Sequence, residues 1–106
     1  MMELDKDTYD SAVLGSTGLF IVDFWSQACE TCAELMPQME ALEKDLEGKV
    51  AFGKVDIQGN RRLAIREKVL GLPSVLIYRN GVKAASFSKE FTPEDVKAKA
   101  MELLSV

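Results

Sequence analysis

The sequence predicts a single α/β domain in which four helices flank a central mixed β-sheet of four to five strands. Strand-like and helix-like segments alternate along the whole chain, which is typical of α/β layers. Helices join most strands to parallel neighbours, whereas Asn80-Gly81 predicts an antiparallel hairpin between the last two. The 106 residues suffice for one core and are too few for two ordinary domains, so we expect residues 1–106 to form one domain.

The N-terminal elements are a short strand, a helix and a buried strand. The first strand is predicted over Met2–Leu4, and Asp5 or Asp7 is expected to cap the helix that follows. That helix carries three apolar residues and ends near two glycines: Tyr9, Val13, Leu14, Gly15 and Gly18. Leu19–Trp25 is apolar throughout except for Asp23, which predicts a central strand buried on both faces.

A long helix is predicted from about Cys29 to Leu46. Its apolar residues recur at helical spacing and define a buried stripe. The stripe consists of Cys32, Leu35, Met36, Met39, Leu42 and Leu46. Pro37 lies inside this helix and is expected to kink it.

The C-terminal half contains the remaining strands and two helices. Strands are predicted over Val50–Asp56, Ser74–Tyr78 and Val82–Phe87. A shorter helix is predicted over Arg61–Val69 and is expected to end at Gly71. The last helix begins at Thr92-Pro93, a cap followed by proline at the first helical position, and runs to about Leu104.

Composition excludes several kinds of chemistry. The chain contains no histidine, so neither a Ser-His or Cys-His catalytic pair nor a His-ligated metal can form. Its two cysteines cannot complete a Cys₄ zinc site within one chain. The net charge of −4 disfavours nucleic acid as a partner. The N-terminus has no signal-peptide pattern and no apolar run is long enough to span a membrane, so we expect a cytoplasmic protein.

The main chemical feature is Cys29-Glu30-Thr31-Cys32, a pair of thiols placed after a buried strand and at the start of a helix. Residues three apart share a helix face, so a disulfide needs only small adjustments. The helix N-terminus stabilises a thiolate, which makes Cys29 the expected nucleophile and the more buried Cys32 the resolving thiol. A structural disulfide is the alternative, although closing so short a loop contributes only about 2 kcal/mol. A further alternative is that the two thiols form half of a zinc site.

Asp23 is the second candidate, because its apolar neighbours should desolvate its carboxyl group and raise its pKa. A carboxylate of this kind can accept the proton of Cys32 by general base catalysis. An aspartate near a strand end that hydrogen-bonds a loop explains the same pattern equally well.

Taken together, these motifs resemble the thioredoxin family over essentially the whole chain. The residues that carry the resemblance are Asp23-Phe24-Trp25, the two cysteines, Pro37, Gly71-Leu72-Pro73 and Asn80-Gly81. The resemblance implies the thioredoxin fold and a protein-disulfide reductase whose redox group is the Cys29–Cys32 disulfide, with no cofactor and no metal. It also implies a monomer that is reduced by a thioredoxin reductase and acts on disulfide-containing proteins.

The resemblance further implies roles for individual residues. Asp23 would assist Cys32, and Lys54 on the neighbouring strand would lie close to Asp23. Trp25 would pack beside the active site. Pro73 would follow a cis peptide bond and help to bind extended substrates, whereas an ordinary trans proline is the expectation for this residue alone.

The chain also departs from the family pattern. The family motif is Trp-Cys-Gly-Pro-Cys, and this chain has Ala28-Cys29-Glu30-Thr31-Cys32 instead. Ala28 removes an exposed aromatic side chain, Glu30 should raise the pKa of the Cys29 thiol, and the Thr31 amide can donate to the thiolate. The family glycine near the substrate groove is missing around Ser88-Lys89-Glu90.

We therefore expect substrates to contact Ala28, Glu30, Thr31, Leu72 and Pro73. Two other classes of function remain open: a thioredoxin-like interaction module without turnover, and a metal-binding protein that uses the dithiol. A glutaredoxin is disfavoured, because no basic cluster that could bind glutathione surrounds the cysteines.

Overall fold

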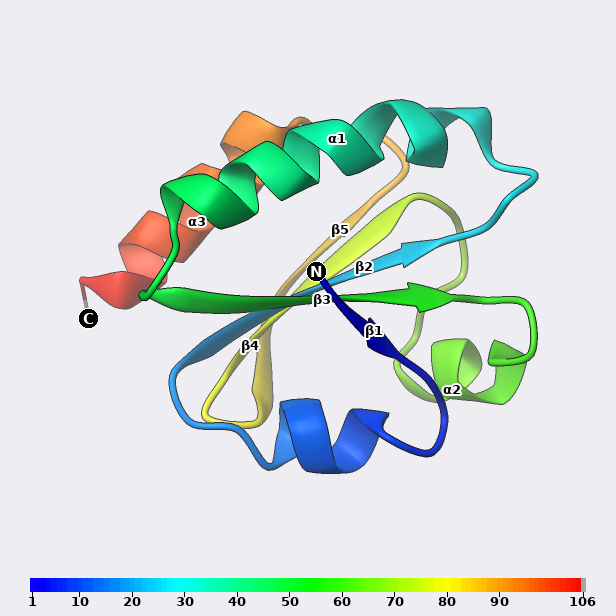
Figure 1. The fold of residues 1–106 in the computed structure, drawn as a ribbon, viewed down its shortest axis with the longest axis horizontal. Helices are drawn as coiled ribbons and strands as arrows, with labels where there is room; N and C mark the ends of the chain where they lie inside the picture. The colour runs from blue at the N-terminus through cyan, green and yellow to red at the C-terminus, as the bar shows by residue number, and fades with distance from the viewer. Residues whose placement is uncertain (106) are drawn as a thin grey trace.

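The predicted strands form one mixed five-stranded sheet in the computed structural model, which describes residues 1–105 (Figure 1). The strands are β1 (Met2–Leu4), β2 (Leu19–Trp25), β3 (Val50–Asp56), β4 (Ser74–Arg79) and β5 (Val82–Ser88). Their order in the sheet is β1-β3-β2-β4-β5. Strand β3 pairs in parallel with β1 and β2, whereas β4 pairs antiparallel with β2 and β5. The central position of β2 and the mixed sheet confirm the prediction.

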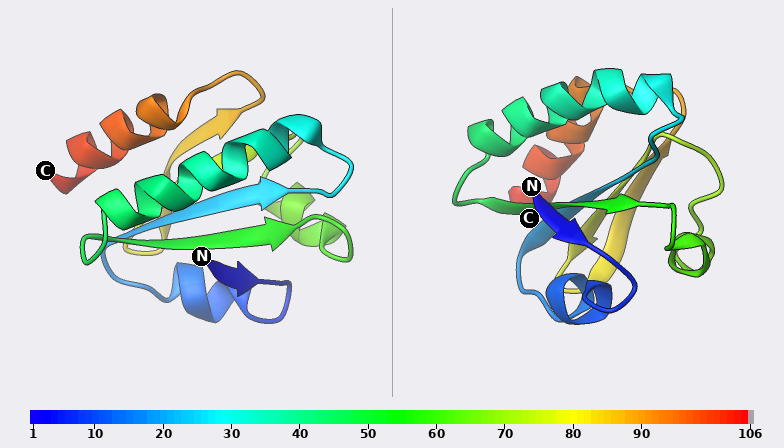
Figure 2. Two further views of the ribbon diagram at one scale, coloured as in Figure 1. Left: turned by 45° about the horizontal axis from the view of Figure 1, so that its top comes forward. Right: turned by 45° about the vertical axis from the view of Figure 1, so that its right-hand side comes forward.

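The helices lie on both faces of the sheet, as predicted (Figures 1 and 2). Helices α1 (Glu30–Asp45) and α3 (Pro93–Leu104) cover one face, and η1 (Asp10–Leu14) and α2 (Arg61–Arg66) cover the other. Two apolar cores result, one on each face of the sheet. Because side chains alternate along a strand, β2 contributes Leu19 and Ile21 to the α1 core and Phe20 and Val22 to the α2 core.

Local sequence signals set several element boundaries as predicted. Asn80 and Gly81 both have positive φ angles, 52° and 79°, as the two central residues of a type I′ hairpin turn require. Thr92 caps α3, accepting a hydrogen bond from the Asp95 amide at 3.1 Å, while the Asp95 carboxylate accepts one from the Thr92 amide at 2.9 Å. Pro93 occupies the first turn of α3, where backbone amides have no partner within the helix, so its lack of an N–H costs no hydrogen bond.

Two helices are shorter than predicted, for identifiable reasons. The first helix is a five-residue π-helix; Asp5, rather than Asp7, accepts hydrogen bonds from the amides of the turn before it. Helix α2 ends before the predicted Val69, because Lys68 adopts a left-handed φ of 64°. The Lys68 amide bonds to Ile65 O and the Val69 amide to Ala64 O, which is a Schellman motif. Gly71 is therefore not the residue that ends this helix.

The α2 core also contains a buried polar chain. Tyr9 and Tyr78 are fully buried, and their hydroxyl groups lie 2.6 Å apart. The Tyr78 hydroxyl donates a second hydrogen bond to the Glu67 carboxylate, and Lys83 donates to the Glu67 carbonyl. These contacts tie the end of α2 to β4 and β5, so the loop from Lys68 into β4 starts from a fixed position.

Candidate active site

The two cysteines form a disulfide at the start of α1. Their Cα atoms lie 5.2 Å apart, and Cys29 is the residue that caps the helix. The Cys29 Sγ accepts a hydrogen bond from the Cys32 amide at 3.2 Å. Cys29 is partly exposed, whereas Cys32 is only 2% exposed and packs under the first turn. Only Cys29 can therefore be reached by a large partner, which agrees with the predicted division between attacking and resolving thiols.

The residues between the cysteines are exposed on the first turn of α1. Thr31 places its hydroxyl oxygen 3.4 Å from Cys29 Sγ, within hydrogen-bonding distance of sulfur. In this disulfide form the amide that reaches the sulfur belongs to Cys32, and donation by the Thr31 amide to the thiolate stays a prediction for the reduced protein. Ala28 and Glu30 are also exposed, and Glu30 adds the only acidic charge in the first turn of α1.

Asp23 lies on β2 directly opposite Lys54 of β3. It faces the α1 side of the sheet, and its side chain is only 1% exposed. Its carboxylate oxygens accept no hydrogen bond within residues 1–105, so the alternative of an aspartate bonded to a loop is wrong. Burial raises the pKa of Asp23 to about 7, and the nearby Lys54 charge only partly opposes this increase. The carboxyl group can therefore take up or release a proton near neutral pH.

A hollow of about 200 Å³, the dithiol hollow, lies beside the disulfide. It is lined by Trp25, Ser26, Gln27, Cys32, Ala33, Met36 and Lys54. Trp25 is half-buried, and its Nε1 is buried without a hydrogen bond in the described part of the chain. Met36, expected in the buried stripe of α1, is half-buried and lines this hollow. The helical spacing of Met36 predicts that it lies on the inner face of α1. The spacing does not predict whether the residue packs in the core or lines a cavity near the end of the helix.

The peptide bond between Leu72 and Pro73 is cis, and Pro73 is buried. The trans alternative, expected from Pro73 alone, was therefore wrong. Ser74 pairs with Phe24, so Pro73 lies at the end of β2 next to Trp25. The Lys89 amide donates to the Pro73 carbonyl at 2.8 Å, which fixes the loop after β5 beside this proline. In Figures 1 and 2 the segment before β4 lies beside the start of α1.

Comparisons with known proteins agree with this arrangement. The family model named Thioredoxin matches residues 1–102. A thioredoxin of Acetoanaerobium sticklandii is 48% identical, over 98% of this chain and 95% of that protein. A thioredoxin of Peptoclostridium acidaminophilum is 41% identical over 92% of this chain and 90% of that protein. A third, from Buchnera aphidicola subsp. Acyrthosiphon pisum, is 32% identical over 91% of this chain and 96% of that protein.

A helix-capping disulfide on this fold, with these similarities, defines a protein thiol–disulfide oxidoreductase. The chain belongs to the thioredoxin family. Members of this family are reduced by thioredoxin reductase, act on disulfide substrates and use a redox-active disulfide as their redox group. No helix within residues 1–105 is long and apolar enough to cross a membrane. The same residues contain no group of three or more Cys, Asp or Glu side chains placed to hold a metal ion.

Proposed function

We propose that this protein reduces disulfide bonds in other proteins, with Cys29 as the attacking thiol and Cys32 as the resolving thiol. The Cys29 thiolate attacks one sulfur of the target disulfide, forming a mixed disulfide and releasing one target thiolate. Cys32 then attacks Cys29, which forms the Cys29–Cys32 disulfide and releases the second target thiolate. Two electrons pass from the dithiol to the target, and a thioredoxin reductase returns them. The observation that carries this proposal is the difference in exposure between the two cysteines.

In this proposal Asp23 accepts the proton that Cys32 loses when it attacks. Asp23 lies on the face of the sheet that α1 covers, next to Lys54, and Lys54 and Cys32 line the same dithiol hollow. A pKa of about 7 allows the carboxylate to accept a proton from a thiol and to release it again at neutral pH. Lys54 keeps a positive charge beside the carboxylate and so limits the increase in its pKa.

The proposed substrate contacts are Ala28, Glu30 and Thr31 on one side of Cys29, and Leu72 and Pro73 on the other. The first three are exposed, and Leu72 is half-buried. Trp25 and Pro73 would support the site from the ends of adjacent strands. We propose that the protein acts as a cytoplasmic monomer, because a disulfide reductase needs a compartment in which its dithiol is kept reduced.

Reduction of insulin in the presence of dithiothreitol tests the activity. The expected result is an acceleration over background that Cys29→Ser abolishes. Cys32→Ser is expected to accumulate mixed disulfides on Cys29, and these would identify the substrates directly. An intact fold with no acceleration would instead support an interaction module.

Metal analysis of the purified protein tests the metal-binding alternative. The dithiol alone offers two sulfur ligands, so a four-thiolate site would require two copies of the chain. Protein purified without added metal should therefore contain no stoichiometric zinc or iron by mass spectrometry. Stoichiometric metal in a dimer would favour the metal-binding function over the reductase.

A further inference from the structure

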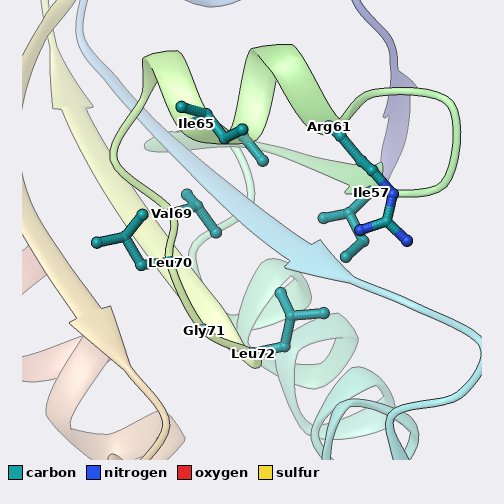
Figure 3. Close-up of a pocket in the computed structure, with 8 residues that line it drawn as sticks. Ile57, Arg61, Ile65, Val69, Leu70, Gly71 and Leu72 are labelled. Carbon is teal, nitrogen blue, oxygen red and sulfur yellow. The ribbon is translucent and has the colours of Figure 1, made fainter.

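A second hollow, the α2 hollow, lies on the other side of the cis peptide bond. It has a volume of about 190 Å³ and is lined by Ile57, Arg61, Ala64, Ile65, Val69, Leu70, Gly71 and Leu72 (Figure 3). Seven of these eight residues are apolar, and Arg61 is the only charged one. Figure 3 shows Arg61 and Ile57 at one end of the hollow and Leu70 at the opposite end.

The rim of the α2 hollow carries apolar side chains that are exposed to solvent. Leu70 is 86% exposed and Ile65 is 65% exposed. The Schellman motif at the end of α2 and the contacts of Glu67 fix the backbone that leads to Leu70, so this exposure follows from a defined loop conformation. Exposed apolar side chains that surround a cavity are typical of an interaction site.

The α2 hollow and the dithiol hollow are lined by residues that neighbour each other across the Leu72–Pro73 peptide unit. Pro73 is at the end of β2 next to Trp25, on the side of the dithiol, whereas Leu72 packs against the α2 core and lines the hollow. Ile57, at the other end of the hollow, donates its amide to the Trp25 carbonyl at 2.9 Å. A chain segment bound across Leu72-Pro73 would therefore pass from the attacked sulfur into the hollow.

Two cations flank the α2 hollow, although the whole chain has a net charge of −4. Arg61 lines one end, and the side chain of Lys89 lies against Gly71, whose added Cβ would be 2.3 Å from Lys89 Cε. Neither side chain forms an ion pair within residues 1–105. No acidic side chain lines the hollow in the described part of the chain. The charge around the hollow is therefore complementary to an acidic partner.

We infer that the α2 hollow recognises one large apolar side chain in an acidic segment of the protein whose disulfide is reduced. A cavity of about 150 Å³ is large enough to hold benzene, so the size of this hollow fits one phenyl or leucyl side chain. Arg61 and Lys89 would bind acidic residues on either side of that side chain. This inference rests on the proposed reductase function and adds the class of sequence that the protein selects.

Matched disulfide peptides test this inference. The first carries a phenylalanine between two glutamates near its intramolecular disulfide; in the second alanine replaces phenylalanine, and in the third lysines replace the glutamates. Bis(2-hydroxyethyl) disulfide is a small neutral reference that reports reduction itself. We expect the wild-type kcat/KM to be about tenfold higher for the first peptide than for the second, as for other apolar pockets.

Variants of the rim should remove these preferences. Leu70→Ser is expected to eliminate most of the phenylalanine preference, whereas Val82→Ser, at an equally apolar exposed position in β5, should leave it intact. The double variant Arg61→Glu and Lys89→Glu should reverse the charge preference and favour the lysine peptide. Thermal unfolding of each variant checks that the fold is retained.

The outcomes distinguish this inference from the proposed function. If the reference disulfide is not reduced, the reductase function itself is wrong. If the reference is reduced but the three peptides have equal kcat/KM values, the inference about the α2 hollow is wrong. A concentration-dependent dimer that Leu70→Ser dissociates would also overturn the inference, because a second copy of the chain would then occupy the hollow.

Discussion

The buried carboxyl group of Asp23 should make the stability of the oxidised protein depend on pH. Its pKa is raised from an ordinary value of 3.8 to about 7 by burial, against the opposing charge of Lys54. In the unfolded chain Asp23 therefore loses its proton at a lower pH than in the folded protein. Between pH 4 and pH 7 unfolding releases a proton, so the stability of the folded state falls as the pH rises through this window.

The magnitude follows from the two pKa values. They differ by about three, and each unit of pKa corresponds to about 1.4 kcal/mol, so ionisation of Asp23 costs about 4 kcal/mol by pH 8. Asp23→Asn removes the titration but keeps the shape of the side chain. We expect the stability of Asp23→Asn relative to the wild type to increase by about 4 kcal/mol from pH 4 to pH 8.

Urea unfolding of both oxidised proteins across this pH range measures the difference. Comparing how the difference changes with pH cancels the fixed cost of a buried amide, which is the same at every pH. Asp7→Asn, at an exposed position, is the matched control and should show no change of this size. A difference that stays constant from pH 4 to pH 8 would refute the raised pKa and, with it, the role proposed for Asp23.

Three further predictions concern the helix ends and the buried polar chain. Glu30→Gln should lower the pKa of the Cys29 thiol by removing a nearby negative charge, measured as the alkylation rate against pH; no downward shift would contradict this. Lys68→Gly should stabilise the protein by about 1 kcal/mol in urea unfolding, because glycine adopts the left-handed φ of 64° without strain. Tyr78→Phe should destabilise it by about 1–3 kcal/mol, since the Glu67 carboxylate loses its buried donor. An unchanged unfolding midpoint in either variant would argue against the role given to that residue.

The features that could be predicted from sequence are those fixed by neighbouring residues. Asn80-Gly81 selects its turn because both residues tolerate positive φ, and Thr92-Pro93 starts a helix because one residue caps it and the other needs no amide partner. The position of Cys29 and Cys32 at the start of α1 could also be predicted, because only a short loop separates the end of the preceding strand at Trp25 from this helix.

The features that could not be predicted depend on contacts between distant segments. The end of α2 at Lys68 carries no glycine signal, and it is held by Glu67, which bonds to β4 and β5. The isomer of Pro73 depends on packing that the local sequence does not encode. Similarly, Met36 has the same helical spacing as its buried neighbours, but it is half-buried and lines the dithiol hollow together with Trp25 and Lys54 from two strands.

The departures from the family motif and the α2 hollow together indicate how recognition is divided around Cys29. Ala28 leaves the α1 side of the sulfur without an aromatic contact, and Glu30 adds a negative charge there. On the other side of the cis peptide bond, Leu70 supplies exposed apolar surface and Lys89 a positive charge. On the inference drawn for the α2 hollow, an acidic partner would be repelled at the first side and attracted at the second, so its segment should run from Cys29 across Leu72-Pro73 toward α2. Glu30 on α1 and Lys89 beside the α2 hollow would in this way orient one class of substrate.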